Sequence, residues 1–476
     1  MFRNDLRIQD NPALAAAVRT GRPVIALYIH APDEEGEWAP GPASNWWLHH
    51  ALLSLRGELL GIGLPLLIRS GSSLDTLRSV ARQYQVRTVY WNRRAEPAAA
   101  TRDEMLGKAL RNEGLEAMAF NASLLFEPHQ IQNRSGQAFK VFTPFWKHLR
   151  TLEIEAPVAV DTARLRQPES RSDSPGIEAL GLLPDSAWDR GFHAEWKPDL
   201  AGAGQALAAF VESTVTHYHE QRDLPAADGT SRLSPYLHFG QLGPRQVWHA
   251  VQESSAAHGQ GAYAFLSELA WREFAHHLLH HFPHTPNQAL SPAYRNFPWQ
   301  PDAEYLSAWQ RGMTGYPMVD AGMRQLWQTG WMHNRLRMVT GSFLVKHLLQ
   351  PWQQGARWFW KTLVDADLAN NTMGWQWVAG CGADAAPYFR IFNPILQGEK
   401  FDPGGDYVRR FVPELASLPD KYIHQPWKAP AGVLKEAGVQ LGRDYPEPII
   451  GHRHGRERAL QALAENKARM AQASDT

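Results

Sequence analysis

The sequence predicts an α/β domain with a doubly wound parallel sheet, followed by a larger all-helical domain. Two observations lead to this prediction. Short apolar runs alternate with amphipathic stretches over residues 1–125, which is typical of parallel βαβ units. From about residue 201 to residue 476 the apolar pattern is helical, is broken by short Pro/Gly turns, and contains no convincing series of strands.

Four apolar runs rich in branched residues are expected to form buried strands: PVIALYI (23–29), LPLLIR (64–69), VRTVYWN (86–92) and LEAMAFN (115–121). The amphipathic stretches between them, residues 44–63, 76–84 and 96–114, are expected to be helices. No GxGxxG motif follows any of these strands, so the sequence does not predict a standard dinucleotide-binding fold.

Residues 126–200 are expected to connect the two domains. From about residue 155 their composition shifts to Pro, Ser, Asp and Gly, which favours a long connection over regular structure. At the other end of the chain, the last twenty residues are expected to form a surface helix that frays into a tail.

The composition excludes several classes of protein. The 476 residues carry 48 basic and 48 acidic side chains, so net charge gives no support for nucleic-acid binding. One cysteine, Cys381, rules out an intramolecular disulfide and argues against thiolate metal sites. The N-terminus lacks the apolar stretch of a secretory signal, and no apolar run approaches the roughly 18 residues of a membrane span. We therefore expect a cytoplasmic protein.

Tryptophan is unusually frequent. The chain has 19, where ordinary usage would give roughly a third as many. Ten of them lie between Trp271 and Trp377. A helical core rich in large aromatic residues explains some of these side chains, but it does not explain why they cluster in one half.

A candidate ligand-binding turn lies in RDLPAADGTSRLSPYLHFG (222–240). Its glycine and hydroxyl residues precede an apolar-periodic segment, with Pro235 at a plausible first helical turn. Backbone N–H groups and hydroxyls in such a place suit a diphosphate. An ordinary capped helix start is the alternative interpretation.

In FLSELAWREFAHHLLHHFPH (265–284), Glu268, Trp271 and Arg272 are spaced i, i+3 and i+4, so they share one helical face. An acid, a ring and a guanidinium together suit a polar ligand with a flat face; a surface ion pair is the alternative.

His276/His280 and His277/His281, in the same segment, have the spacing of metal ligands. Without HExxH or a third ligand, no metal site is predicted.

Two carboxylates in DADLANN, Asp365 and Asp367, could bind a metal or the polar end of a cofactor, or lie in a solvated turn.

Six segments are specific in combination because they occur in a fixed order: DGTSRLSPYLHFG, WREF, TGYPMVDAGMRQL, TGWMHNRLRM, DLANNTMGWQW and YFRIFNP. In this order they resemble the flavin-binding half of the DNA photolyase and cryptochrome family. The similarity extends from FRNDLR to YPEPIIGH and implies an α/β antenna domain followed by an all-helical domain that holds FAD.

The resemblance also implies roles for single residues. Asn371 would face flavin N5, and Trp375, Trp352 and Trp299 match the tryptophan chain that reduces photoexcited flavin. The residues implied to hold FAD are Tyr218, Thr230, Ser231, Arg232, Leu233, Ser234, Arg272, Asn334, Arg337, Asp365, Ala366, Asp367 and Asn371.

The implied substrate is damaged DNA that contains cyclobutane pyrimidine dimers, repaired by electron transfer from excited reduced FAD to the flipped-out lesion. Extruding a dimer costs less than flipping a normal pair, which costs a few kcal/mol. The resemblance assigns the lesion pocket to Glu268, Trp271, Asn334, Met338 and Trp377. It assigns phosphate contacts, which give salt-dependent affinity, to Arg222, Arg335, Arg390 and Lys400.

The alternative is a cryptochrome-type blue-light receptor that signals through partners. Plant cryptochromes resemble the TGYP and DADL segments strongly, but they carry Asp at the position of Asn371 and usually Tyr at that of Trp377. The chain also ends soon after YPEPIIGH, without a long signalling extension. Asn334 and Met338 fit enzymes for cyclobutane dimers rather than 6-4 photolyases. Repair by a monomer is therefore the preferred hypothesis.

Two departures from the family concern the N-terminal domain. The family's first strand normally precedes FRNDLR, where this chain begins, so we expect a start site placed too far downstream or a truncation. The absent strand should leave a gap between its neighbours in the sheet. The carboxylate that often holds folate is replaced by Ala98 or Ala99, with Glu96 as a possible substitute. As antenna pigment, methenyltetrahydrofolate is expected in preference to deazaflavin.

Overall fold

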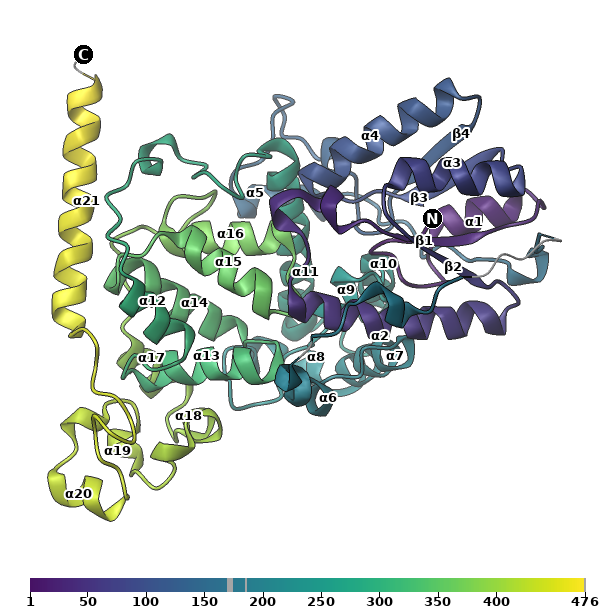
Figure 1. The fold of residues 1–476 in the computed structure, drawn as a ribbon. Coiled ribbons are helices and arrows are strands. Elements are labelled where there is room, and N and C mark those ends of the chain that lie inside the picture. The colour runs from purple at the N-terminus through teal and green to yellow at the C-terminus, as the bar shows by residue number, and fades with distance from the viewer. Residues whose placement is uncertain (169–173, 185, 475–476) are drawn as a thin grey trace. The chain divides into compact units, whose positions relative to one another are not determined.

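The computed structural model describes residues 1–168, 174–184 and 186–474 (Figure 1). The chain folds into two compact units that are interleaved in sequence. Unit 1 comprises Met1–His219, Ser231–Pro283 and Val364–Ala369, and unit 2 comprises Glu220–Thr230, His284–Leu363 and Asn370–Thr476. The domain boundaries expected near residues 125 and 200 stay a prediction. A search of the described helices finds none long and apolar enough to cross a membrane.

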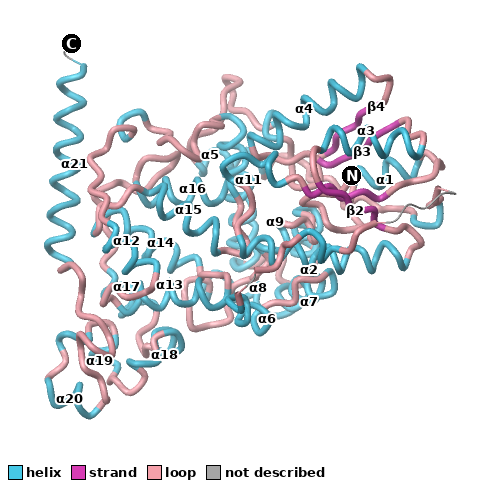
Figure 2. Tube along the Cα trace, in the orientation of Figure 1, coloured by secondary structure: helices cyan, strands magenta, loops and turns pink. Residues whose placement is uncertain are grey.

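The predicted strands form, and all pair in parallel (Figure 2). They are β1 (Ala26–His30), β2 (Leu66–Ser70), β3 (Thr88–Asn92) and β4 (Glu116–Phe120). Ala26 of β1 lies opposite Leu66 of β2, and Thr88 of β3 lies opposite Glu116 of β4. The single sheet that we expected is divided, because β1–β2 and β3–β4 are two separate two-stranded sheets.

Helices cover both faces of these strands. The predicted helices are α2 (Pro42–Gly61), α3 (Ser73–Tyr84) and α4 (Pro97–Asn112). Leu77 and Val80 of α3 pack with the side chains of Leu27 and Val89. On the other face lies α1 (Pro12–Arg19), where the Ala13 amide donates to the Asn92 side chain at 3.3 Å. The doubly wound arrangement is therefore confirmed. Helix α1 was not predicted, because its short, alanine-rich sequence has no distinct apolar stripe.

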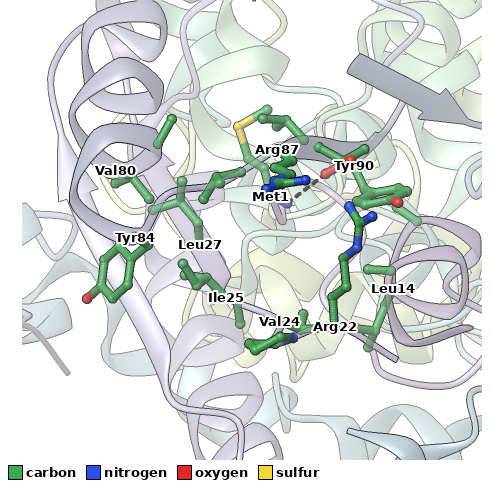
Figure 3. A pocket seen from close by; sticks show the side chains of 18 of the residues that line it. Met1, Leu14, Arg22, Val24, Ile25, Leu27, Val80, Tyr84, Arg87 and Tyr90 are labelled. Carbon is green, nitrogen blue, oxygen red and sulfur yellow. Dashed lines mark hydrogen bonds between the residues drawn. The ribbon is translucent and has the colours of Figure 1, made fainter. Parts of the chain in front are cut away.

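The gap expected at the absent first strand is present. The Phe2 amide donates to the Leu27 carbonyl at 2.7 Å, and the Met1 ammonium donates to the Tyr90 carbonyl at 2.8 Å. The first two residues thus lie between β1 and β3, and a cavity of about 330 Å³ adjoins them (Figure 3). Phe2 and Tyr28 form only an isolated parallel bridge, so no strand of the described chain joins the two sheets.

From residue 201 on, the described chain contains helices and no strand, as predicted. Residues 126–200, expected to be a connection, also contain helices, because short apolar stretches there pack on other elements. The α-helices after β4 fall on either side of residue 283. Up to residue 283 they are α5 (Phe142–Leu149), α6 (Phe192–Glu195), α7 (Leu200–Ala209), α8 (Val215–Gln221), α9 (Ser234–His238), α10 (Pro244–Gln252) and α11 (Gln260–His281). Beyond it they are α12 (Ala303–Gln310), α13 (Pro317–Thr329), α14 (Asn334–Ser342), α15 (Trp352–Thr362), α16 (Leu368–Ala379), α17 (Pro394–Phe401), α18 (Asp406–Phe411), α19 (Asp420–Ile423), α20 (Ala431–Glu436) and α21 (His452–Ser474). Helix α21 confirms the expected C-terminal helix.

The TGYPMVD segment is held in unit 2 by one buried carboxylate. Asp320 accepts hydrogen bonds from the Thr314 amide at 2.7 Å, the Thr314 hydroxyl at 2.6 Å and the Gly315 amide at 3.0 Å. The hydroxyl of Tyr445 donates to it at 2.6 Å. Gly315 has φ +79°, and an added Cβ would lie 2.4 Å from the Glu447 backbone, so this turn requires glycine. A network of buried hydrogen bonds around Asp320 therefore fixes the TGYPMVD segment.

Candidate functional site

In unit 1, helix α11 presents Glu268, Trp271 and Arg272 on one half-buried face. Trp271 stacks on Phe142 of α5, with ring centroids 3.7 Å apart and an angle of 9° between the planes. The Arg272 guanidinium donates to the Ser123 carbonyl at 2.8 Å. The face predicted from the i, i+3, i+4 spacing thus carries a fixed ring and a fixed cation.

Buried carboxylates lie close to this face. Glu273 accepts a hydrogen bond from the Leu125 amide at 2.9 Å, and burial raises its pKa. Asp367 lies 3.3 Å from His276 Nε2 and 3.4 Å from His238 Nδ1. Burial alone would raise the pKa of Asp367, but the charge and hydrogen bonds of these two histidines hold it well below its ordinary value. Asp367 is therefore a fixed anion.

The candidate diphosphate turn contacts the DADL segment within unit 1. The Ser234 hydroxyl donates to Asp365 at 2.6 Å, although 131 positions separate the two residues. Pro235 lies in the first turn of α9, as predicted. Arg232 has φ +51°, and its guanidinium donates to Glu195 at 3.0 Å. The other residues predicted here are Ser231, half-buried; Leu233 and Ala366, buried; and Tyr218, buried edge-on to Phe210 and Phe265.

A metal site gains no support from the described residues, where no group of three His, Cys, Asp or Glu could hold an ion. His277, one of the candidate ligands, accepts a hydrogen bond from the Phe139 amide at 3.0 Å. Burial lowers its pKa to about 4, so its imidazole is neutral at pH 7. The histidine spacing on α11 therefore reflects packing.

In unit 2, α14 carries Asn334 in its first turn, with Arg337 and Met338 three and four residues later. Asn334 is exposed, and the other two are half-buried. Arg337 is fixed by donation from its Nε to the Met332 carbonyl at 2.8 Å. Arg335 points to other partners: its guanidinium lies 2.7 Å from Asp223 and 4.3 Å from the centre of the Phe401 ring.

Helix α16 brings three predicted residues together. The Asn371 amide donates to the Ala356 carbonyl at 3.0 Å, which fixes the orientation of its side chain. Trp375 is buried, whereas Trp377 is half-buried and stacks near Phe392, with centroids 6.5 Å apart.

The three tryptophans of the predicted electron-transfer chain differ in exposure. Trp375 and Trp352 are buried in the core of unit 2, with exposed fractions of 3% and 2%. Trp299 is half-buried and packs on Phe297, with centroids 4.6 Å apart. A chain that starts at a buried cofactor and ends near solvent requires this order of exposure.

Gly355 is expected to control the position of Trp375. A Cβ at residue 355 would lie 2.1 Å from the Trp375 ring, which is also held by Phe359 at 5.0 Å. We predict that Gly355→Ala lowers the free energy of unfolding by roughly 1–3 kcal/mol, because the ring or α15 must move. Chemical unfolding measures this loss, and photoreduction of the bound flavin should slow in parallel.

The matched control is Gly374→Ala, in the same helix as Trp375. A Cβ there meets nothing within 4 Å, so this variant should be more stable by about 0.5–1 kcal/mol. Equal stability of the two variants would contradict the predicted role of Gly355.

The remaining predicted DNA contacts lie in unit 2. Arg390 and Lys400 are exposed, and Arg222 is half-buried. Thr230, predicted to hold FAD, also lies in unit 2 and is half-buried. The backbone carbonyl of Arg390 accepts a hydrogen bond from the buried Lys346 ammonium at 2.7 Å. Burial, with a smaller contribution from the charge of Arg390, lowers the pKa of Lys346 to about 7.

The lowered pKa of Lys346 predicts that the free energy of unfolding depends on pH. Between pH 7 and about pH 10, the unfolded chain keeps the Lys346 proton and the folded chain has lost it. The unfolded state then binds more protons, so the free energy of unfolding should rise with pH, by up to about 1.4 kcal/mol per unit. Urea unfolding at pH 7, 8 and 9 should show a flatter profile for Lys346→Met. The control Lys361→Met, at an exposed position, should keep the slope.

The donors and acceptors of unit 1 suit the sugar and diphosphate of a flavin nucleotide. In unit 1, hydroxyl, guanidinium and backbone N–H donors gather around residues 231–234, next to carboxylates that can accept from sugar hydroxyls. Buried polar atoms without a hydrogen-bond partner in the described chain include His276 Nδ1 in unit 1 and Trp375 Nε1 in unit 2. Orphaned buried groups of this kind are expected where a ligand is bound.

Comparisons with known proteins agree with this chemistry. Residues 265–465 match the family described as FAD binding domain of DNA photolyase, and residues 1–163 match DNA photolyase. A deoxyribodipyrimidine photo-lyase from Agrobacterium fabrum is 47% identical over 98% of this chain and 97% of its own. Cryptochrome-1 of Arabidopsis thaliana is 38% identical over 98% of this chain and 70% of its own. The crystal structure of a class III photolyase from Agrobacterium tumefaciens matches with a TM-score of 0.95 and 47% identity, covering 98% of this chain and 97% of the other.

The fold, the donor set and these matches define a flavoprotein with an α/β domain and a helical FAD-binding domain. The chain belongs to the DNA photolyase family. The predicted family, the predicted order of the two kinds of domain and the prediction of a photolyase enzyme are thereby confirmed. The cryptochrome relatives are less similar in sequence.

Sequence reasoning missed several residues that shape the site. Phe142 lies in the segment expected to be a connection, yet it backs Trp271. His238 and His276 hold Asp367, although the second of them was considered only as a metal ligand. The available signal was the run of histidines on one apolar helix; the partner carboxylate is distant in sequence and could not be inferred.

Proposed function

We propose that the protein repairs cyclobutane pyrimidine dimers in DNA with blue light, as the names of its photo-lyase relatives suggest. When bound, FAD supplies the light absorption and the electron for the reaction. The observation that carries the proposal furthest is the Ser234–Asp365 hydrogen bond, because it joins two motifs of the flavin-binding half that the sequence separates.

The flavin-binding roles follow from the fixed groups. Ser231, Ser234 and the backbone of the 231–234 turn would bind the diphosphate. Arg272, held by the Ser123 carbonyl, would supply a cation to the same cofactor. Asp365 would accept from the sugar hydroxyls. Asn371 is held by its own amide donation to the Ala356 carbonyl, so its oxygen keeps one orientation and would accept a hydrogen bond from the flavin.

The lesion-binding roles follow from two half-buried aromatic rings. Trp271 offers a ring whose close stacking on Phe142 fixes its plane, and Trp377 offers a second ring beside Phe392. Stacking of this kind contributes roughly 1–3 kcal/mol per base and is largely independent of sequence. Glu268 would hydrogen-bond the dimer, and Arg390 and Lys400 would contact phosphates.

Repair of a defined substrate tests the proposal. Purified protein, loaded with FAD and reduced, should restore an oligonucleotide that contains one thymine dimer under blue light and leave it unchanged in the dark. Binding should weaken steeply with salt, because phosphate contacts release counterions. No repair by fully loaded protein would refute the proposal and favour the blue-light receptor. Gel filtration and fractionation would test the expected monomer and its cytoplasmic location.

The expected methenyltetrahydrofolate antenna gains no carboxylate from the structure. Glu96 is half-buried and pairs with Arg94 at 3.0 Å, and Glu35 pairs with the same guanidinium at 2.6 Å. Burial opposes ionisation of Glu96, but Arg94 outweighs it and lowers the pKa to about 2. Because Glu96 is committed to this network, we assign it no pigment contact. The near-ultraviolet absorption of the purified protein distinguishes folate from deazaflavin.

A further inference from the structure

A buried lysine in unit 2 lies beside the segment that carries Arg390. Helix α14 ends at Ser342 and continues as a π-helical turn, Phe343–His347, whose residues are all buried. Lys346 belongs to this turn and is 1% exposed. Lysine is almost never fully buried unless its ammonium has a partner. Since π-helical turns are frequent at functional sites, the partner of this ammonium is informative.

The Lys346 ammonium holds the backbone of a long loop. It donates to the Arg390 carbonyl at 2.7 Å. Arg390 belongs to residues 380–393, which join α16 to α17 and in which the structure describes no helix or strand. The Phe392 amide of the same loop donates to the Ser342 hydroxyl at 3.4 Å. Two side chains about one helical turn apart thus anchor the loop from the core.

The loop has a buried side and an exposed side. Tyr388 is buried, and its ring centre lies 5.6 Å from the Lys346 ammonium. The neighbouring Phe389 is 64% exposed, and Arg390 is exposed as well. Within the described residues the Arg390 guanidinium pairs with no carboxylate, in contrast to that of Arg335. The guanidinium is therefore available to a phosphate.

Stability alone does not account for a lysine at this position. Burial lowers the pKa of Lys346 to about 7, so the surrounding core opposes its charge. Replacement of buried charged groups by apolar side chains of similar volume is often neutral or stabilising. The loop that the ammonium holds is therefore the better explanation of its presence.

We propose that Lys346 is a positioning residue for DNA binding: by holding the Arg390 carbonyl from the core, it fixes the backbone from which the Arg390 guanidinium reaches a DNA phosphate. This inference rests on the proposed DNA-binding role of Arg390 and deepens it. An anchored backbone reduces the conformational entropy that Arg390 loses when it binds. Because Lys346 is buried, it acts on DNA through Arg390 and not by contact.

A double-mutant cycle tests whether Lys346 acts through Arg390. The full chain loaded with FAD, Lys346→Met, Arg390→Ala and the double variant are titrated with a dimer-containing oligonucleotide in the dark, by fluorescence anisotropy at several salt concentrations. Lys346→Met should bind about 3- to 10-fold more weakly. The slope of log Kd against log salt should become less steep by up to about 0.9, the value for one phosphate. In the Arg390→Ala background, Lys346→Met should have no further effect.

Two further measurements separate positioning from a loss of fold. Without DNA, hydrogen exchange of residues 383–393 should be faster in Lys346→Met, and that of α13 should be unchanged. With saturating oligonucleotide, the rate of light-driven repair should equal that of the unmodified protein, because Lys346 is not among the residues assigned to FAD. If Lys346→Met does not fold, Lys346→Gln replaces it; its amide ends one bond short of the ammonium, and the same losses are expected.

The matched control is Lys361→Met, which removes an exposed lysine of α15 and should bind DNA as the unmodified protein does. Additive losses in the double variant would mean that Lys346 acts on DNA by its own charge, and they would overturn the proposal. Unchanged exchange of residues 383–393 would overturn it as well. If the unmodified protein does not bind the oligonucleotide, the proposed function and the DNA-binding part of this inference both fail, and faster exchange would then show only that Lys346 holds the loop.

Discussion

Replacing Asp320 by alanine should lower the free energy of unfolding by roughly 3–5 kcal/mol. The carboxylate is fully buried and accepts from two backbone amides and two hydroxyls. Alanine would leave the Thr314 and Gly315 amides and the Tyr445 hydroxyl without their acceptor. Each unsatisfied buried donor costs about 1–3 kcal/mol. Urea unfolding at pH 7, followed by circular dichroism, measures the loss.

The control for this prediction is Asp161→Ala. Asp161 is exposed and pairs with exposed Arg164 at the surface, where such pairs contribute at most about 1 kcal/mol. A loss below about 1 kcal/mol in the Asp320 variant would mean that water replaces the carboxylate, and the network would not be the anchor of the TGYP turn. Tyr445→Phe, which removes one donor and leaves the others satisfied, should fall between the two.

Trp271→Ala should weaken the binding of a dimer-containing oligonucleotide by about 5- to 150-fold, the equivalent of one stacked base. The ring is held parallel to Phe142, so its face is already oriented before DNA binds. Anisotropy titrations of damaged and undamaged oligonucleotides in the dark measure the effect. Affinity for undamaged DNA should change little, because phosphate contacts dominate it.

Trp271→Phe is the matched variant, since it keeps an aromatic face on Phe142 and should recover most of the affinity. Trp327→Ala, which removes a half-exposed indole elsewhere in the helical part, should bind both DNAs normally. Equal loss for damaged and undamaged DNA in Trp271→Ala would contradict a lesion-specific role for this ring.

Local patterns predicted the elements well and their packing less well. The four strand segments and α2, α3 and α4 were found to within a few residues, because each has a clear period. The expected gap at the first strand is present. The division of the sheet into two pairs of strands follows from this gap, and the spacing of apolar residues within each strand does not reveal it. Helix α1 was not predicted, because alanine occupies many of its positions and its buried face is not distinct in the apolar pattern.

The same limit applies to the candidate functional site: local patterns predict geometry within one helix but not contacts between helices. Spacing along α11 predicted the shared face of Glu268, Trp271 and Arg272, since one helix fixes that geometry. The contact between Ser234 and Asp365, and the burial of Lys346, depend on which helices pack together. Single-sequence patterns do not contain that information; the family resemblance supplied the grouping of residues and not their distances.

The interleaving of the two units has a consequence for synthesis on the ribosome. Asp365 and Asp367 belong to the short segment that completes unit 1 after much of unit 2 has been made. Until that segment emerges, Ser234, His238 and His276 have no carboxylate to bind. A gene fragment that ends before Val364 should therefore yield a nascent chain with an unfinished first unit, and no single cut in the gene yields either unit whole.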